Sequence, residues 1–125
     1  MHRGLALLGT AVAATVLAVG TAQAYATQSG QTHVDHCVNT VSGGTQGNYF
    51  IADAWGGAGC NASYVELVYI DKSGTERYKK VSSTVVSGPN ATIKLANSSY
   101  KSILEVIGSS DSIQNHNTGG VYLYF

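Results

Sequence analysis

The stretch that decides the fold is SYVELVYIDKSGTERYKKVS, residues 63–82. Its two flanks are rich in Val, Ile, Thr and Tyr, which favour strands, and the Asp, Ser and Gly between them are typical turn formers. The segment therefore predicts a β-hairpin. With residues 71–74 as a four-residue turn, Glu66 lies opposite Lys79 in the expected register.

The same alternation of strand-forming segments and turn residues continues along the chain. A second hairpin is expected around residues 97–99, with Ile93 opposite Leu104 on a shared apolar face. Further strand-length segments are residues 48–55, 91–96, 100–107 and 121–125. About six or seven short strands without a long helix predict an all-β fold. We expect a small antiparallel β-sandwich, immunoglobulin-like or similar, or a small barrel.

Residues 33–41 carry a mixed signal. Their apolar side chains recur at helical spacing, but the segment is short and rich in β-branched residues. We interpret it as a strand.

At the other end of the chain, residues 121–125 are expected to form a strand whose Val121, Leu123 and Phe125 share one buried face.

The N-terminus has the pattern of a secretory signal peptide. A short basic start precedes an apolar run, and Ala22-Gln23-Ala24 supplies a signal peptidase site. We expect residues 1–24 to be removed, leaving residues 25–125 as one secreted, extracellular β-domain without a membrane span. Residues 25–31 are expected to form a loose arm, and the Ala-rich leader is typical of a bacterial protein.

The charge balance excludes one class of function. The chain has 125 residues with 7 Lys and Arg against 7 Asp and Glu, so its formal net charge is zero. A protein that binds nucleic acid by neutralising phosphates needs a clustered basic surface, which this composition does not offer. We therefore expect no nucleic-acid partner.

The two cysteines predict a disulfide. Cys37 and Cys60 are the only cysteines, and a secreted chain meets an oxidising compartment. Zinc ligation would need a second close pair of Cys or His. Trp55 lies between the cysteines, which meets the immunoglobulin pattern only in part because it stands close to the second one. We therefore expect a bridge that stabilises the domain, and no resemblance to a particular family.

The best candidate binding residues lie in and beside YFIADAW, residues 49–55. Alternation places Asp53 on the same strand face as Trp55, and Tyr64 follows the Gly-rich loop after this strand. We expect a binding surface formed by Asp53, Trp55 and Tyr64. The simpler alternative makes Trp55 a core residue, with Asp53 reaching solvent at a sheet edge.

Metal and catalytic sites are weakly supported. The segment His33 to His36 offers nitrogen and oxygen ligands, but on a strand its two histidines face opposite sides. We expect no metal and no cofactor.

Nucleophile and phosphate-binding motifs are lacking. Asp53 and Glu66 could form a glycosidase pair, but the expected register gives Glu66 an ordinary cross-strand ion pair with Lys79 instead. If the protein were a hydrolase, its acid and base groups would be Asp53, Glu66, His36 and His116.

These observations predict a small non-catalytic binding module. Eight Tyr and one Trp with few charges are typical of surfaces that bind through aromatic contacts. The expected partner is extracellular, either a protein such as an enzyme that the module inhibits, or a polysaccharide, and we expect a monomer. A small secreted hydrolase and a structural matrix component that assembles through strand edges are the alternatives.

Overall fold

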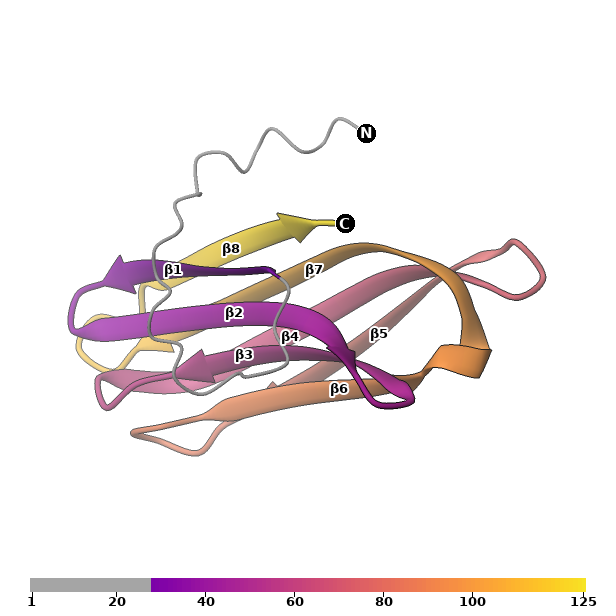
Figure 1. Ribbon diagram of the computed structural model, residues 1–125. Coiled ribbons are helices and arrows are strands. Elements are labelled where there is room, and N and C mark those ends of the chain that lie inside the picture. Colours follow the sequence, from indigo (N-terminus) through magenta and orange to yellow (C-terminus); the bar gives the residue numbers. More distant parts are fainter. Residues whose placement is uncertain (1–27) are drawn as a thin grey trace.

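The computed structural model describes residues 28–125, so the expected signal peptide and residues 25–27 lie outside the described part. The described chain forms two antiparallel sheets packed face to face (Figure 1). The strands are β1 (Gln28–Val34), β2 (Cys37–Gln46), β3 (Tyr49–Gly56), β4 (Cys60–Asp71), β5 (Glu76–Ser83), β6 (Asn90–Ala96), β7 (Tyr100–Ser112) and β8 (Thr118–Tyr124). The predicted β-sandwich is confirmed, and the sheets do not close into a barrel.

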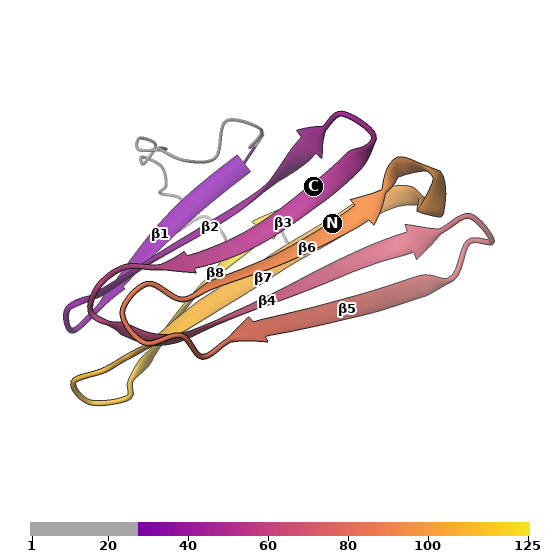
Figure 2. The same cartoon turned by 90° about the horizontal axis from the view of Figure 1, so that it is seen from below.

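Each sheet has four strands. Sheet A has the order β1-β2-β3-β6, and sheet B has the order β5-β4-β7-β8. Figure 2 shows the two layers from below, with β4 and β5 beneath β3 and β6. Edge strands β1 and β6 of sheet A therefore lie over edge strands β8 and β5 of sheet B, as the contacts between these pairs also show.

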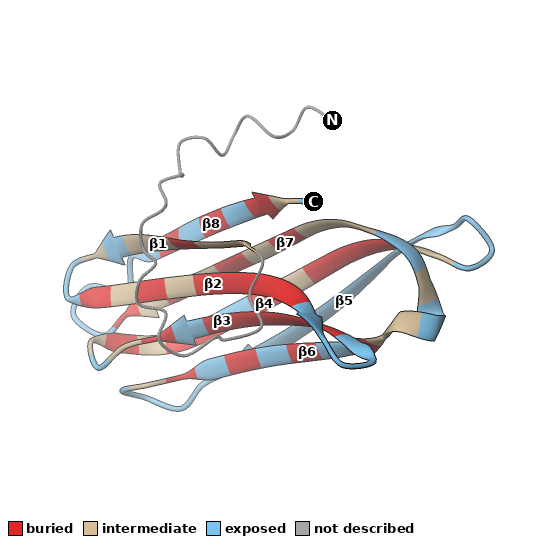
Figure 3. Cartoon of the chain, viewed as in Figure 1, coloured by how far each residue is buried: buried red, intermediate tan, exposed pale blue. Residues whose placement is uncertain are grey.

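The core lies between the inner faces of the two sheets. Strands β6 and β8 alternate strictly between buried and exposed residues, the pattern of a half-buried strand (Figure 3). Strand β5, at the edge of sheet B, is exposed along almost its whole length. The inner side chains include Val41, Phe50, Ala52, Ala54, Val65, Leu67, Ile93, Leu95, Val106, Val121 and Leu123.

The N-terminal expectation needs correction. Residues 28–31, expected in a loose arm, form the first half of β1 and pair with β2, for example Gly30 with Val41. Residues 33–41 are extended, as predicted, but they belong to two strands. A tight turn at Asp35 and His36 separates them, and Asp35 has a φ of 56°. A polar arm was expected because β1 has few apolar residues, but backbone pairing with β2 holds it in the sheet.

The first predicted hairpin exists, but its register was wrong by one residue. Glu66 lies opposite Lys80, and not opposite Lys79. The reason is the turn: the Asp71 N–H donates to the Thr75 carbonyl at 2.8 Å, and Gly74 has a φ of +90°. This is a three-residue loop with a glycine in the left-handed conformation, so the pairing moves by one position.

The second predicted hairpin was wrong. Strand β6 pairs with β3 in sheet A, and β7 pairs with β4 in sheet B. A short 3-10 turn, η2 (Asn97–Ser99), carries the chain from one sheet to the other. The apolar side chains of β6 and β7 belong to the same core, but β6 lies across the core from β4 and β5, and β7 lies across the core from β2 and β3.

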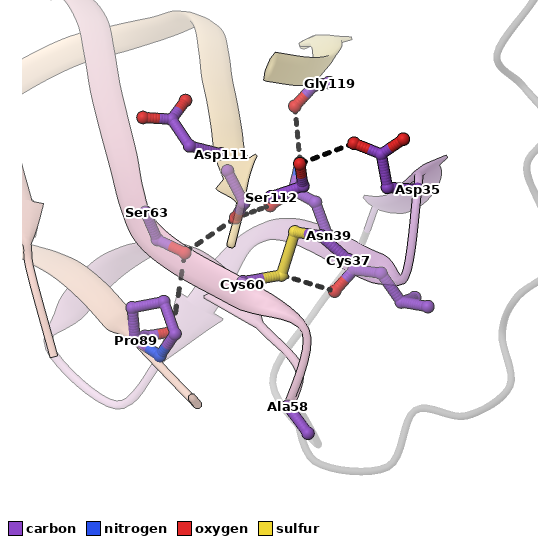
Figure 4. Close-up of a disulfide and its surroundings, with 12 residues drawn as sticks. Asp35, Cys37, Asn39, Ala58, Cys60, Ser63, Pro89, Asp111, Ser112 and Gly119 are labelled. Carbon is purple, nitrogen blue, oxygen red and sulfur yellow. Dashed lines mark hydrogen bonds between the residues drawn. A yellow bond between two sulfur atoms is a disulfide. The ribbon is translucent and has the colours of Figure 1, made fainter. Parts of the chain in front are cut away.

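The predicted disulfide is confirmed. Cys37 at the start of β2 is bonded to Cys60 at the start of β4, so the bridge joins sheet A to sheet B (Figure 4). Both cysteines are buried.

The C-terminal strand is confirmed, with one exception. Val121 and Leu123 are buried in the core, but Phe125 is 38% exposed. Its ring still packs edge-on against Phe50, with ring centroids 5.3 Å apart. The tip of the Phe125 ring lies at the position of a Gly43 side chain, which the core residues Phe50 and Val106 also border, so the ring covers the end of the core.

Candidate functional site

The three predicted binding residues do not form one surface. In β3, Ala54 points into the core, so its neighbours Asp53 and Trp55 point to the outer face of sheet A. In β4, Val65 points into the core, so Tyr64 points to the outer face of sheet B. Asp53 and Trp55 therefore share a face, and Tyr64 lies on the opposite side of the sandwich.

The burial of these residues is the reverse of the simpler alternative, in which Trp55 is a core residue and Asp53 reaches solvent. Trp55 is 43% exposed and not part of the core, whereas Asp53 is only 2% exposed. Asp53 accepts a hydrogen bond of 2.6 Å from the Thr92 hydroxyl on β6. Burial raises the pKa of the Asp53 carboxyl, and the Thr92 hydrogen bond offsets part of that rise.

The raised pKa of Asp53 gives a prediction about pH. The folded state holds the Asp53 proton more tightly than the unfolded chain, so this carboxyl reduces stability as pH rises from its ordinary pKa of 3.8 through the raised value. Asp53→Asn removes that loss, because the amide does not titrate. We expect the free energy of unfolding of the variant, relative to that of the wild type, to be higher at pH 7 than at pH 3. Urea denaturation at the two pH values measures this difference. An equal difference at both pH values would contradict this.

The Asp53–Glu66 pair of the hydrolase alternative finds no support in this geometry. Glu66 alternates with the core residues Val65 and Leu67, so it lies on the outer face of sheet B, while Asp53 lies on sheet A. The core separates the two carboxyls, and they cannot flank one glycosidic bond. The Glu66 side chain instead lies in the row that contains Lys80.

The histidine segment also forms no metal site within residues 28–125, where no three His, Cys, Asp or Glu side chains gather closely enough to hold an ion. Asp35 accepts hydrogen bonds from the side chains of Ser112, Asn115 and Asn117. These bonds, with the Ser112 hydroxyl the strongest influence, lower the pKa of Asp35. The carboxylate thereby fixes the β7–β8 loop to the β1–β2 turn.

A buried polar cluster lies beside the disulfide. The Ser63 and Ser110 hydroxyls are 2.6 Å apart, and the Ser110 hydroxyl donates to Asn39 Oδ1 at 2.7 Å. The single Ser63 hydrogen is then donated to Ser110, and the Pro89 carbonyl, 3.4 Å from Ser63 Oγ, is an alternative acceptor for it (Figure 4). These groups satisfy one another between the sheets, and none of them is a general base. The cluster therefore fixes the packing of this end of the sandwich and has no catalytic arrangement.

The outer face of sheet B contains a groove of about 370 Å³. Cross-strand pairing places Tyr64 between Ser82 and Ser109, and the next row of the face places Glu66 between Lys80 and Ile107. The side chains that line the groove on this face are Tyr64, Glu66, Lys80, Ser82, Ile107 and Ser109. An aromatic ring and an aliphatic chain are thus surrounded by hydroxyl, carboxylate and ammonium groups.

Tyr64 is held in position at the end of this groove. It is 39% exposed, and its hydroxyl donates a hydrogen bond of 3.0 Å to Asp111 Oδ2. The Thr118 hydroxyl donates to the other oxygen of Asp111 at 2.7 Å. The bond to the carboxylate raises the pKa of Tyr64, so the phenol stays a neutral donor. The ring is therefore oriented before any ligand arrives.

A second exposed tyrosine lies on the same face. Tyr122 on β8 is 48% exposed and lies opposite Ile107 of the groove. Sequence reasoning identified Tyr64 but not Tyr122, Ile107 or Ser109. Alternation along residues 100–112 and 118–124 could have placed these side chains on one face of each strand, but not in neighbouring rows, because the order of the strands was unknown.

Comparison with known proteins leaves the site to be interpreted from its own geometry. No family model, no curated protein and no solved structure matches this chain. Among the described residues, no helix is long and apolar enough to cross a membrane.

Proposed function

We propose that this protein is a non-catalytic binding module and that the outer face of sheet B binds a polysaccharide chain. The observation that carries the proposal is the groove around Tyr64, Glu66 and Ile107, because it combines apolar side chains with several polar groups. An extracellular location belongs to this proposal. It rests on the N-terminal sequence pattern and on the disulfide, which is typical of oxidising compartments.

The chemistry of the groove suits a sugar ring. One face of a pyranose is lined by C–H groups and packs on an aromatic ring, while its hydroxyls need hydrogen-bond partners around the rim. Tyr64 supplies the ring, and Glu66 and Ser109 supply acceptors and donors beside it. Because these side chains stand on neighbouring strands of one sheet, their positions are largely fixed before binding. The loss of conformational entropy on binding is therefore small.

The distance between Tyr64 and Tyr122 suits a polysaccharide and not a single sugar. Tyr64 and Gly120 lie in one row across β4, β7 and β8, and Tyr122 is one row further along β8. Two strand spacings and one row separate Tyr64 from Tyr122, or roughly 12 Å between backbones. This separation is on the scale of a disaccharide, so both rings can contact one extended polymer.

A protein partner is the second candidate, favoured by the loop between β5 and β6. Val85 and Val86 are exposed there, although both are large apolar side chains. Ser87 anchors the loop, because its N–H donates to the Cys60 carbonyl and its hydroxyl to the Ala58 carbonyl. A rigid loop with apolar side chains is a feature of protein-binding surfaces.

Substitution of the tyrosines tests the polysaccharide proposal. Tyr64→Ala and Tyr122→Ala are expected to weaken binding about tenfold each, as loss of about 1.4 kcal/mol of aromatic contact implies. Trp55→Ala, on the opposite sheet, is the matched control and should bind like the wild type. The measurement is affinity gel electrophoresis with hydroxyethyl cellulose, laminarin, xylan and soluble chitin fragments.

Thermal unfolding separates loss of binding from loss of fold, and all three variants should melt close to the wild type because the side chains are exposed. Retardation by none of the polysaccharides would overturn the proposal. So would a loss of binding in Trp55→Ala alone, because it would assign the site to sheet A. Retention of a protein partner that depends on Val85 and Val86 would support the second candidate.

A further inference from the structure

The four edge strands of the sandwich differ in charge. Strands β5 and β6 contain Glu76, Arg77, Lys79, Lys80 and Lys94, whereas β1 and β8 contain no Asp, Glu, Lys or Arg. Charged side chains on an edge strand oppose pairing with a further strand. One side of this molecule is therefore protected against sheet extension, and the side formed by β1 and β8 is not.

The hydrogen bonds at both ends of β8 show which backbone groups face outward. The Ser112 N–H donates to the Asn117 carbonyl, and the Phe125 N–H donates to the Leu104 carbonyl. Odd-numbered residues of this segment therefore face β7, and the even-numbered Thr118, Gly120 and Tyr122 direct their N–H and C=O groups to the edge that no other described strand covers. The Tyr124 carbonyl fits this parity, because it accepts the Gln28 side-chain amide at 2.5 Å.

We propose that two copies of this chain associate by antiparallel pairing of their β8 strands about a two-fold axis at Gly120. In this arrangement Gly120 lies opposite Gly120 of the second copy, and Thr118 lies opposite Tyr122. All three outward-facing residues then pair with one another, which gives about six backbone hydrogen bonds. The two copies of sheet B become one continuous sheet.

The segment fits a second copy of itself for three reasons. The outward-facing residues are placed symmetrically about Gly120, so the strand is complementary to its own antiparallel image. Thr118 and Tyr122 form a β-branched and aromatic cross-strand pair, which stabilises antiparallel pairing. The formal net charge of the chain is zero, so electrostatic repulsion between copies is small. This inference replaces the monomer expected from sequence and does not depend on the identity of the ligand.

A charge introduced at the two-fold axis tests the proposal. A side chain fits at position 120, because the nearest atoms to an added Cβ are the Gly108 carbonyl at 3.4 Å and Ser109 Cβ at 3.6 Å. Two lysines or two glutamates would face each other there and oppose pairing. Gly120→Lys and Gly120→Glu are each expected to raise the dimer dissociation constant at least tenfold, whereas a mixture of the two should restore the dimer.

Sedimentation equilibrium over a range from micromolar to near-millimolar protein measures this, since an interface of one strand pair is small and expected to be weak. Gly120→Ala keeps the N–H and adds no charge, so it should dimerise like the wild type. Gln31→Lys places the same charge on the β1 edge and should also leave the dimer intact. Circular dichroism checks that each variant is folded.

A wild-type protein that stays monomeric up to near-millimolar concentration would overturn the proposal. A dimer that Gly120→Lys leaves unchanged, or that Gln31→Lys dissociates instead, would also overturn it by assigning the contact to another surface. Recovery of the dimer only in the mixture of Lys and Glu variants would support pairing at position 120 directly.

Discussion

Replacing Cys37 and Cys60 together by alanine is expected to lower the free energy of unfolding by about 3 kcal/mol. The two cysteines are 23 residues apart, and closing a loop of this length restricts the unfolded chain by about that amount in the chain-entropy account. For a domain of this size, 3 kcal/mol is a large part of the total stability.

The surroundings of the bridge add to this effect. The Gly57 N–H donates to the Val38 carbonyl, and the Ser87 N–H donates to the Cys60 carbonyl. Both bonds join different loops or strands at the disulfide end of the sandwich. Loss of the bridge is therefore expected to loosen the β3–β4 and β5–β6 loops before the rest of the sheets.

Urea denaturation followed by far-ultraviolet circular dichroism measures the loss, and the wild type under reducing conditions provides a second route to the same state. Hydrogen exchange would locate the first openings, which we expect near Gly57 and Ser87. A double alanine variant within about 1 kcal/mol of the wild type would contradict the entropic argument, since it would leave loop closure with little effect.

The faces of the strands could be predicted from sequence because they depend on local alternation. In β3 the pattern correctly placed Asp53 and Trp55 on one face, and the structure puts Phe50, Ala52 and Ala54 on the other, in the core. The number of short strands identified the sandwich, and the presence of only two cysteines in a chain expected to be secreted identified the disulfide. Alternation does not determine which of the two faces of a strand points into the core between the sheets. It also does not determine how deeply an outer residue such as Asp53 is buried.

Register and sheet order could not be predicted because they depend on contacts distant in sequence. The β4–β5 register depended on the conformation of Gly74, and the separation of β6 from β7 depended on the short turn at residues 97–99. The candidate site shared this difficulty. Tyr64 follows Trp55 closely in the chain, yet the β3–β4 connection passes between sheets, so the two residues point to opposite sides.

The two proposals have a joint consequence for affinity. Pairing of two β8 strands would place two copies of the groove on one continuous sheet face, with both Tyr122 side chains near the two-fold axis. A polymer long enough to cross the axis would then contact both copies, and binding of the second site would become intramolecular. Wild-type protein at concentrations where it is dimeric is therefore expected to bind long polysaccharide more tightly than the same protein diluted to monomers, while short oligosaccharides should not distinguish the two states.

Deletion of residues 121–125 is expected to abolish cooperative folding. The deletion removes Val121 and Leu123 from the core, at about 1.5–3 kcal/mol of burial each, and it exposes the edge of β7. It also removes Phe125, whose ring packs against Phe50 and lies where a side chain on Gly43 would stand. Together these losses approach the whole stability of a small domain.

The single substitution Leu123→Ala tests the same argument in a protein that can still fold. Leu123 is buried in the core, so truncation leaves a cavity, and we expect a loss of about 2–5 kcal/mol. Tyr122→Ala is the matched control, because its side chain points outward from the adjacent position and should cost far less. A full-length Leu123→Ala variant as stable as Tyr122→Ala, or a shortened protein with a sharp wild-type melting transition, would show that β8 does not complete the core.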